Sequence, residues 1–471
     1  MESLGFLLVV AFAMGLATNF ISKALGPGTS PVVFLLVFST FSGYLNNLFD
    51  RHPLIHIARF AVLTLIALFW LLARKRTISA AGASTSPMDP LVWGFFTYYA
   101  LQMFNPHWSS PRVAVLNGLI GLAQHGFPMV LFFIGRELIR SPKQIAGIFY
   151  LLISLSVVMA VYGVYQHLMG LEYVENLGPG FRMTVHRELL WRTDNFDIAV
   201  LRPMSFAPDA GTASSFYTVG ILLAGAMLTT GQLVVKVQVL LVAAMATMFL
   251  GLCLTLVRSS MVGTFLGLGL VVLVGKRSFR SGIALLVLAL VVGNFDDPTG
   301  GMLTERFKSG FNPSELGRSR GKQLEGIIWA ATNFPIGMGI GRGGPAGGRY
   351  NEPEDNEYTF PPESYFVTLI FETGVIGLYF AVRIYFSLFM HCVQAVMRVR
   401  DPELHPLALA ISVVLASTML VSFVGPTLYA APLSYLFWTL AGLLFRVLEL
   451  ERASRAQLRA RAQQAAAERK D

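Results

Sequence analysis

Charged residues are scarce in this sequence. Only 13% of its 471 residues are Asp, Glu, Lys or Arg, and 54% are hydrophobic, whereas an average soluble domain has roughly 25% charged residues. The mean hydropathy of +0.59 leaves little length for a separate water-soluble enzyme domain. The formal net charge is +9, but the basic residues lie mostly in short loops between apolar runs. This distribution is typical of the cytoplasmic side of a membrane protein, so nucleic acid is not expected as a partner.

Metal-binding patterns are also lacking. The two cysteines, Cys253 and Cys392, have neither the spacing nor the surroundings of a disulfide or a zinc site. His52 and His56 are i, i+4 neighbours, a spacing that can hold a metal, but no further His or Cys lies close to them in the sequence. His125 lies within an apolar run and is interpreted as a satisfied core residue. We therefore expect no metal and no cofactor.

Long apolar runs are abundant. A helix needs about 20 residues to cross the hydrocarbon core, and most of the runs approach that length. We predict an all-α polytopic membrane protein with about 12–14 transmembrane helices, because unpaired backbone groups are not tolerated in lipid and no alternating strand pattern occurs. The runs fall at about 3–22, 31–49, 54–73, 90–104, 113–135, 144–168, 210–230, 233–257, 260–275, 281–293, 364–390, 407–424 and 430–448.

The basic residues predict the orientation. If the two long loops at about 169–209 and 294–363 are extracytoplasmic, most basic residues of the short loops become cytoplasmic, as the positive-inside rule requires. The short external segments would hold only Arg51, Arg59, Arg112 and Arg258. The cytoplasmic set would be Lys23, Arg74, Lys75, Arg76, Arg136, Arg140, Lys143, Lys236, Lys276, Arg277, Arg280, Arg398 and Arg400.

The predicted organisation is a single transmembrane domain, 1–448, followed by a basic cytoplasmic tail, 449–471. The first residues carry Glu2 and no Lys or Arg before their apolar stretch, so we interpret them as the first membrane helix rather than a cleaved signal. The Ala-, Arg- and Gln-rich tail favours a helix that is solvated or lies on the membrane surface. No internal repeat of the kind found in inverted-repeat transporters occurs, which weakens a carrier interpretation.

The first long loop ends in the segment Arg202-Pro-Met-Ser-Phe-Ala-Pro-Asp209. Its prolines stiffen a turn before a helix that begins near Ala210, and Asp209 can either cap that helix or bind a ligand. Arg258 stands between two apolar spans, which marks it as a functional position unless it snorkels to the interface. Arg383, inside an apolar run, is interpreted as a member of a buried ion pair.

The second long loop contains Gly337-Met-Gly-Ile-Gly-Arg342. The run superficially resembles a dinucleotide-binding loop, but it follows no βαβ unit and has no Lys-Ser/Thr ending, so nucleotide binding is rejected. Glycines at this spacing more plausibly allow a tight turn or a close approach of backbone to a ligand. The loop then returns to the membrane through Pro362-Glu363-Ser364-Tyr365.

Four motifs in this order resemble the bacterial O-antigen ligase and Wzy-type polysaccharide polymerase family. Together they extend over residues 200–390. The motifs are Arg202 to Pro208, Arg258-Ser259, Arg320…Trp329…Pro335-Ile-Gly-Met-Gly-Ile-Gly341, and Ser364-Tyr365…Glu372-Thr-Gly374.

The resemblance implies a fold similar to that of the multi-span, GT-C-like glycosyltransferases, in the bacterial inner membrane, with extracytoplasmic catalytic loops. It implies transfer of a glycan from undecaprenyl pyrophosphate to an acceptor hydroxyl at the outer face of that membrane, without nucleotide or metal. The implied partners are the lipid-linked glycan, membrane lipid and, for a polymerase, a chain-length regulator. Polymerisation of repeat units is the expected function. The alternatives are a ligase that moves a finished glycan onto a lipid or protein, and a lipid-linked oligosaccharide flippase or transporter.

The resemblance also implies roles for individual residues. Arg202, Arg258 and Arg320, with Arg318 as the alternative to Arg320, become candidates for binding the pyrophosphate, because arginine pairs well with phosphate oxygens. Arg258 and Glu363 are the expected catalytic residues, and Asp209 and Tyr365 are expected to contact substrate. Many ligases have a catalytic histidine where this sequence has Pro362. We therefore expect Glu363 to act as the general base, although capping of the helix near Ser364 would equally explain it.

Overall fold

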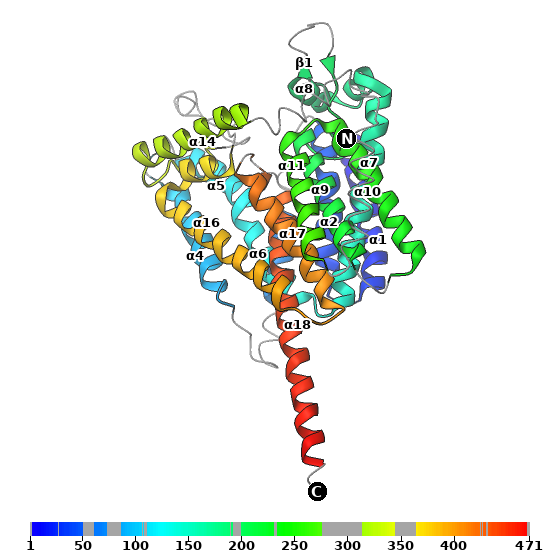
Figure 1. Ribbon diagram of the computed structural model, residues 1–471. Helices are drawn as coiled ribbons and strands as arrows, with labels where there is room; N and C mark the ends of the chain where they lie inside the picture. Colours follow the sequence, from blue (N-terminus) through cyan, green and yellow to red (C-terminus); the bar gives the residue numbers. More distant parts are fainter. Residues whose placement is uncertain are drawn as a thin grey trace.

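The computed structural model describes the chain as a bundle of long helices (Figure 1). Within the described residues, eight helices are long and apolar enough to cross a membrane, and the predicted all-α polytopic membrane fold is confirmed. A short antiparallel pair of strands, β1 (Leu190–Trp191) and β2 (Ala199–Val200), interrupts the helices. The described residues are 2–26, 28–49, 61–72, 86–105, 107, 111–188, 190–191, 199–229, 233–275, 313–343, 364–423, 425, 427–429 and 432–468.

Helices coincide, in whole or in part, with each predicted span except 281–293, which lies outside the described residues. The helices are α1 (Glu2–Leu25), α2 (Ser30–Leu48), Ala61–Leu72, α4 (Asp89–Leu101), η1 (Gln102–Phe104), α5 (Pro111–Gly121), η2 (Leu122–Gly126), α6 (Phe127–Leu138), α7 (Pro142–Asn176), α8 (Pro179–Glu188), α9 (Ala210–Leu228), α10 (Val235–Thr255), α11 (Arg258–Val274), α14 (Pro313–Asn333), α16 (Tyr365–Arg398), α17 (Leu404–Ser422), η4 (Thr427–Tyr429) and α18 (Leu433–Glu468).

α9 lies at the centre of one half of the bundle. It packs against α7, α10, α11 and α17, and 94% of the residues in its most apolar 18-residue stretch are buried. Its hydroxyl side chains pair with those of α11, Ser214 with Ser260 and Thr218 with Thr264, each at 2.8 Å between the oxygens. Such pairs link helices in an apolar region, where neither hydroxyl has water as an alternative partner.

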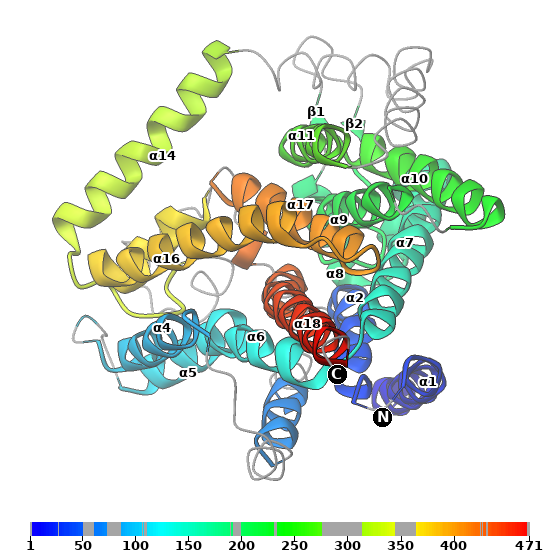
Figure 2. The same cartoon turned by 60° about the horizontal axis from the view of Figure 1, so that its bottom comes forward.

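The other half of the bundle holds α4, α5 and α6, and α18 packs against α6 (Figure 2). α16 and α17 lie between the two halves. Two of the long helices are broken at a glycine, α7 at Gly170 (φ 81°) and α16 at Gly374 (φ 66°). The break in α7 falls just after the predicted end of its span at residue 168, so the first long loop begins with a further turn of helix.

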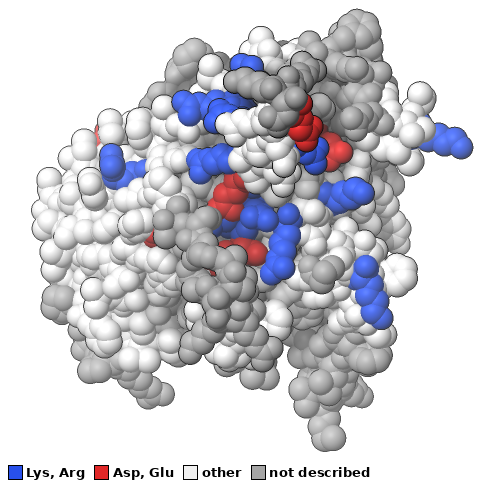
Figure 3. Space-filling view, turned by 90° about the horizontal axis from the view of Figure 1, so that it is seen from below, with Lys and Arg blue, Asp and Glu red and all other residues white. Residues whose placement is uncertain are grey.

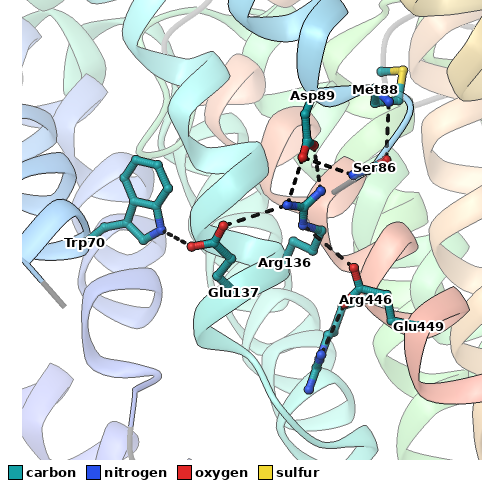
Figure 4. Close-up of polar contacts among 8 residues, drawn as sticks. All are labelled: Trp70, Ser86, Met88, Asp89, Arg136, Glu137, Arg446 and Glu449. Atoms are coloured by element: carbon teal, nitrogen blue, oxygen red, sulfur yellow. Dashed lines mark hydrogen bonds and ion pairs between the residues drawn. The ribbon is translucent and has the colours of Figure 1, made fainter. Parts of the chain in front are cut away.

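A buried network of charged residues joins the start of α4, the C-terminal end of α6 and the middle of α18 (Figure 4). The guanidinium of Arg136 is 3% exposed and lies 2.6 Å from an Asp89 carboxylate oxygen, 3.7 Å from Glu137 and 3.8 Å from Glu449. The indole N–H of Trp70, from the helix Ala61–Leu72, donates to Glu137 at 2.8 Å. One arginine thus connects four helices at what we call the Arg136 end of the bundle.

α18 continues past the Arg136 end as a single helix to Glu468 and projects from the bundle (Figure 1). The predicted tail, 449–471, therefore starts within this helix rather than after it. Figure 3 shows Lys and Arg side chains on the same face, gathered around carboxylates. On α18, Arg455 donates to Glu451 at 2.7 Å and to the carbonyl of Arg398.

We predict that Arg136→Ala lowers the free energy of unfolding by about 3–5 kcal/mol, because it leaves buried carboxylates without their counter-charge. Thermal unfolding of the purified protein in detergent measures the effect. Arg459→Ala, on the exposed part of α18, removes the same side chain from a solvated position and serves as the control. Equal melting temperatures for the two variants would contradict the prediction.

Candidate functional site

Two of the predicted arginines lie close together at the opposite end of the bundle, which we call the Arg258 end. α10 ends at Leu256, which is left-handed (φ 55°), and after Val257 the chain reverses into α11, whose first residue is Arg258. Arg202 is half-buried, and its Nε donates to the carbonyl of Thr255 at 2.8 Å. Arg202 is therefore fastened to the same turn that presents Arg258.

The turn that carries Arg202 is held rigidly by buried hydrogen bonds. Ser205 has a positive φ of 54°; its amide donates to Gln166 at 2.7 Å and its hydroxyl to the carbonyl of Met159 at 2.6 Å. The side-chain amide of Asn47 donates to the carbonyl of Pro208 at 3.2 Å. The prolines and these contacts from α2 and α7 fix the direction in which Arg202 leaves the turn.

Asp209 caps α9. Its carboxylate accepts the amide N–H of Thr212 at 2.6 Å and the hydroxyl of Thr212 at 3.1 Å. The capping role that the sequence left open is thus confirmed, and a role in binding substrate stays a prediction.

A cavity lies next to Arg258, between α9, α11 and α17. The cavity is small, with a volume of about 20 Å³, and its walls are mainly apolar. Ser260, two residues after Arg258, lines it together with Ser215, Ser417 and Thr418. A cavity of this size has room for about one water molecule.

Tyr365 is the first residue of α16 and is only 3% exposed. Its ring lies 5.4 Å from the ring of His125 and 5.7 Å from that of Tyr429, measured between centroids. Tyr365 therefore lies within a buried aromatic cluster. η4, which contains Tyr429, packs against both α9 and α16.

His125 belongs to the same cluster and differs from its prediction. It is buried, as expected, and lies 3.8 Å from the ring of Tyr429. However, its Nε2 hydrogen-bonds to none of the described residues, so the interpretation as a satisfied histidine is wrong. The residue sits in η2, a π-helical turn, where the extra residue displaces side chains from the ordinary helical positions.

The break in α16 lies beside this cluster. A helix that ends at Thr373 leaves its last carbonyls without partners within the helix, and in a membrane these must be satisfied by other protein groups. The segment after α14, residues 334–343, which we call the glycine loop, supplies amide donors to two of these carbonyls. Met338 N–H donates to Phe371 O at 2.8 Å, Gly339 N–H to Glu372 O at 3.0 Å, the Tyr98 hydroxyl to Thr373 O at 2.7 Å and, beyond the break, Val375 N–H to Pro335 O at 2.9 Å.

The side chain of Glu372 completes this arrangement and is fully buried. One carboxylate oxygen accepts the amide N–H groups of Gly341 at 3.0 Å and Gly343 at 2.9 Å. The other accepts the hydroxyls of Tyr99 at 3.0 Å and Tyr429 at 2.7 Å. Burial is the main cause that raises the pKa of Tyr429 well above its usual value, and the nearby carboxylate of Glu372 is the second cause. The hydroxyl therefore keeps the proton that it donates.

The glycines are required where the loop crosses α16 and α5. Gly337 and Gly374 both have positive φ, 82° and 66°, and a Cβ on Gly374 would collide with the carbonyl of Pro335. A Cβ on Gly341 would collide with the carbonyl of Asn117. The spacing that resembled a dinucleotide loop thus allows backbone to pack directly against backbone. In the sequence, Glu372 is recognisable only as part of the Glu372-Thr-Gly374 motif, with no role of its own. The break of α16 at Gly374 explains why the two residues occur together.

The structure describes the remaining predicted residues only in part. Arg318 and Arg320 belong to α14, but their side chains are outside the described part of the structure. Glu363, His52 and His56 lie outside the described residues. Arg383 is exposed on α16 and forms no ion pair with any described residue, so its interpretation as part of a buried ion pair is wrong. Its helix turns that position outward, away from the core.

Residues 243–382 match the sequence model of a family described as O-antigen ligase. The match extends from within α10 to within α16 and includes Arg258, the glycine loop, Glu372 and Gly374. It confirms the resemblance to the O-antigen ligase and Wzy-type family over this part of the chain. No curated protein matches the chain.

The chain is similar to a solved structure described as "Structural coordination of polymerization and crosslinking by a peptidoglycan synthase complex". The two sequences are 16% identical, and the alignment covers 79% of this chain and 99% of that chain with a TM-score of 0.42. A likeness at this score carries no argument about function.

We predict that Gly374→Ala lowers the stability of the folded protein by at least about 1–3 kcal/mol, the usual cost of a residue forced into an unfavourable backbone region. The yield of monodisperse protein and its melting temperature measure the effect. Gly269→Ala is the matched control, because its Cβ would meet nothing within 4 Å in the middle of α11. Wild-type behaviour of Gly374→Ala would show that the break tolerates a side chain.

Proposed function

We propose that this protein polymerises polysaccharide repeat units that are linked to undecaprenyl pyrophosphate, at the outer face of the bacterial inner membrane. The observation that carries the proposal is the hydrogen bond from Arg202 to the carbonyl of Thr255. Thr255 is the last residue of α10, at the α10–α11 turn, three residues before Arg258. Two guanidinium groups at one turn suit the two phosphates of a lipid pyrophosphate, since arginine binds phosphate oxygens through paired hydrogen bonds.

The proposed reaction is an inverting glycosyl transfer. A hydroxyl oxygen of one repeat unit attacks the anomeric carbon of the lipid-linked glycan, and the bond from that carbon to the pyrophosphate oxygen breaks. The leaving undecaprenyl pyrophosphate takes the electron pair, and the arginines stabilise the negative charge that develops on it. The proton of the attacking hydroxyl goes to a general base, for which we propose Glu363, as a carboxylate is ionised near neutral pH.

Arg318 and Arg320 of α14, Asp209 and Tyr365 are the further residues that we propose for binding the donor or acceptor. The Arg136 end, with the basic residues of α18, would then face the cytoplasm, in agreement with the positive-inside rule.

A ligase within the same family is the second candidate. The residue in this chain at the position of the family's histidine is Pro362, which favours the polymerase. A flippase would need polar groups that follow a path across the bilayer. In the described spans, the buried charges of Figure 4 are paired with one another near one end instead.

The test is the glycan profile of a strain that lacks this protein and is complemented with variants. Wild type should restore long polymer, and Arg258→Ala should leave single repeat units at a normal protein level. Loss of one such donor typically costs about 3–4 kcal/mol, or a factor of about 10² to 10³ in rate. Glu363→Gln should behave similarly, and Arg383→Ala, an exposed arginine of α16, should restore long polymer.

Other outcomes would reject the polymerase. Long lipid-linked polymer that persists without the protein but never reaches its final acceptor would identify a ligase. Lipid translocation by the purified protein without any joining of glycans would identify a flippase.

A further inference from the structure

Among the described residues, α14 packs mainly against α16. It has 21 residues, a length of about 31 Å at 1.5 Å per residue. Ala330 and Ile327 face α16, where they pack with Ile370 and Phe371. Leu324, Ile328 and Trp329 are 60%, 56% and 39% exposed. Figure 2 shows α14 along the edge of the molecule beside α16.

The C-terminal end of α14 runs directly into the glycine loop. Phe334 N–H donates to Ala330 O at 2.9 Å, and Gly337 N–H to Phe334 O at 2.9 Å, so helix and loop form one continuous hydrogen-bonded unit. The carbonyls of this unit are held by α4 and the residues after it. Gln102 donates to Ile336 O at 3.1 Å and Asn105 to Gly337 O at 3.0 Å.

Glu372 is the only side chain among the described residues that is shown to bind amide groups of the glycine loop. Its two oxygens accept four hydrogen bonds from four separate positions, Gly341, Gly343, Tyr99 and Tyr429. These positions belong to the glycine loop, α4 and η4. A carboxylate is required because only it offers acceptor sites on both oxygens. An apolar residue would leave four buried donors unsatisfied.

We propose that Glu372 is a positioning residue, which fixes the glycine loop and, through it, the C-terminal end of α14. Its carboxylate then determines where the helix that carries Arg318 and Arg320 lies against the bundle. The catalytic consequence rests on the proposed function, because it assumes that these arginines bind the pyrophosphate of the donor. The mechanical part does not, since it concerns only where α14 lies.

The mechanical part is tested by the distance between spin labels at Leu324→Cys on α14 and Val382→Cys on α16. Both positions are exposed, whereas Cys253 and Cys392 are buried. The wild type should give one narrow distance distribution. Glu372→Gln, which replaces one acceptor oxygen by an amide, and Tyr429→Phe, which deletes one hydroxyl, should each broaden it. Tyr379→Phe removes an exposed hydroxyl from α16, the helix of Glu372, and should leave the distribution narrow.

The catalytic part is tested by the kinetics of glycan joining by the same variants, per mole of folded protein. If α14 is displaced, the KM for the lipid-linked donor should rise about tenfold in Glu372→Gln and less in Tyr429→Phe. A residue that only stabilises the fold would lower the amount of folded protein and leave this KM unchanged. Tyr429→Phe keeps the test valid if Glu372→Gln does not fold.

Each result decides one part of the proposal. Narrow distributions in both variants would overturn the role of Glu372 in placing α14. Broad distributions with an unchanged KM would overturn the link between α14 and donor binding. If the wild type joins no glycans at all, the proposed function fails, and broad distributions would still support the role of Glu372 in fixing α14.

Discussion

The carboxylate of Glu372 satisfies a constraint that the membrane imposes on this fold. A spanning helix that breaks, as α16 does at Gly374, exposes carbonyl groups where no water can reach them. Backbone amides of the glycine loop donate hydrogen bonds to these carbonyls. Glu372 accepts two further hydrogen bonds from loop amides and two from tyrosine hydroxyls. The aromatic cluster of Tyr99, His125 and Tyr365 is assembled around this point. The break, the loop and the carboxylate therefore depend on one another.

The two ends of the bundle use charge differently. At the Arg136 end, a buried arginine is surrounded by three carboxylates, an arrangement that consumes its charge within the protein and joins helices. At the Arg258 end, the carbonyl of Thr255 accepts a hydrogen bond from Arg202 and so orients its guanidinium at the turn that carries Arg258. The proposed function uses these two guanidinium groups to bind phosphate oxygens.

The motifs that resemble the ligase and polymerase family have structural reasons that can be separated from catalysis. The turn from Arg202 to Pro208 is anchored by Gln166 and Asn47. The alternate glycines of the glycine loop permit close packing against α5 and α16. The pair Glu372 and Gly374 marks the break and the group that satisfies it. Three of the four motifs therefore preserve the backbone geometry around a site, and their order along the chain reflects the order in which the helices reach it.

The sequence by itself determined the membrane fold, the approximate positions of the described spans and the resemblance to the O-antigen ligase family, because these follow from local hydropathy and from short motifs. It also offered capping of α9 as one of two roles for Asp209, since capping depends on neighbouring residues alone. Only the tertiary structure decided which side of a helix faces the core, so Arg383 proved exposed and Nε2 of His125 proved to have no hydrogen-bond partner among the described residues. It alone brought Glu372 to Tyr99, 273 positions away in the sequence. Hydrogen bonds over such separations leave no periodic signal in a single sequence, since their partners are selected by the packing of whole helices.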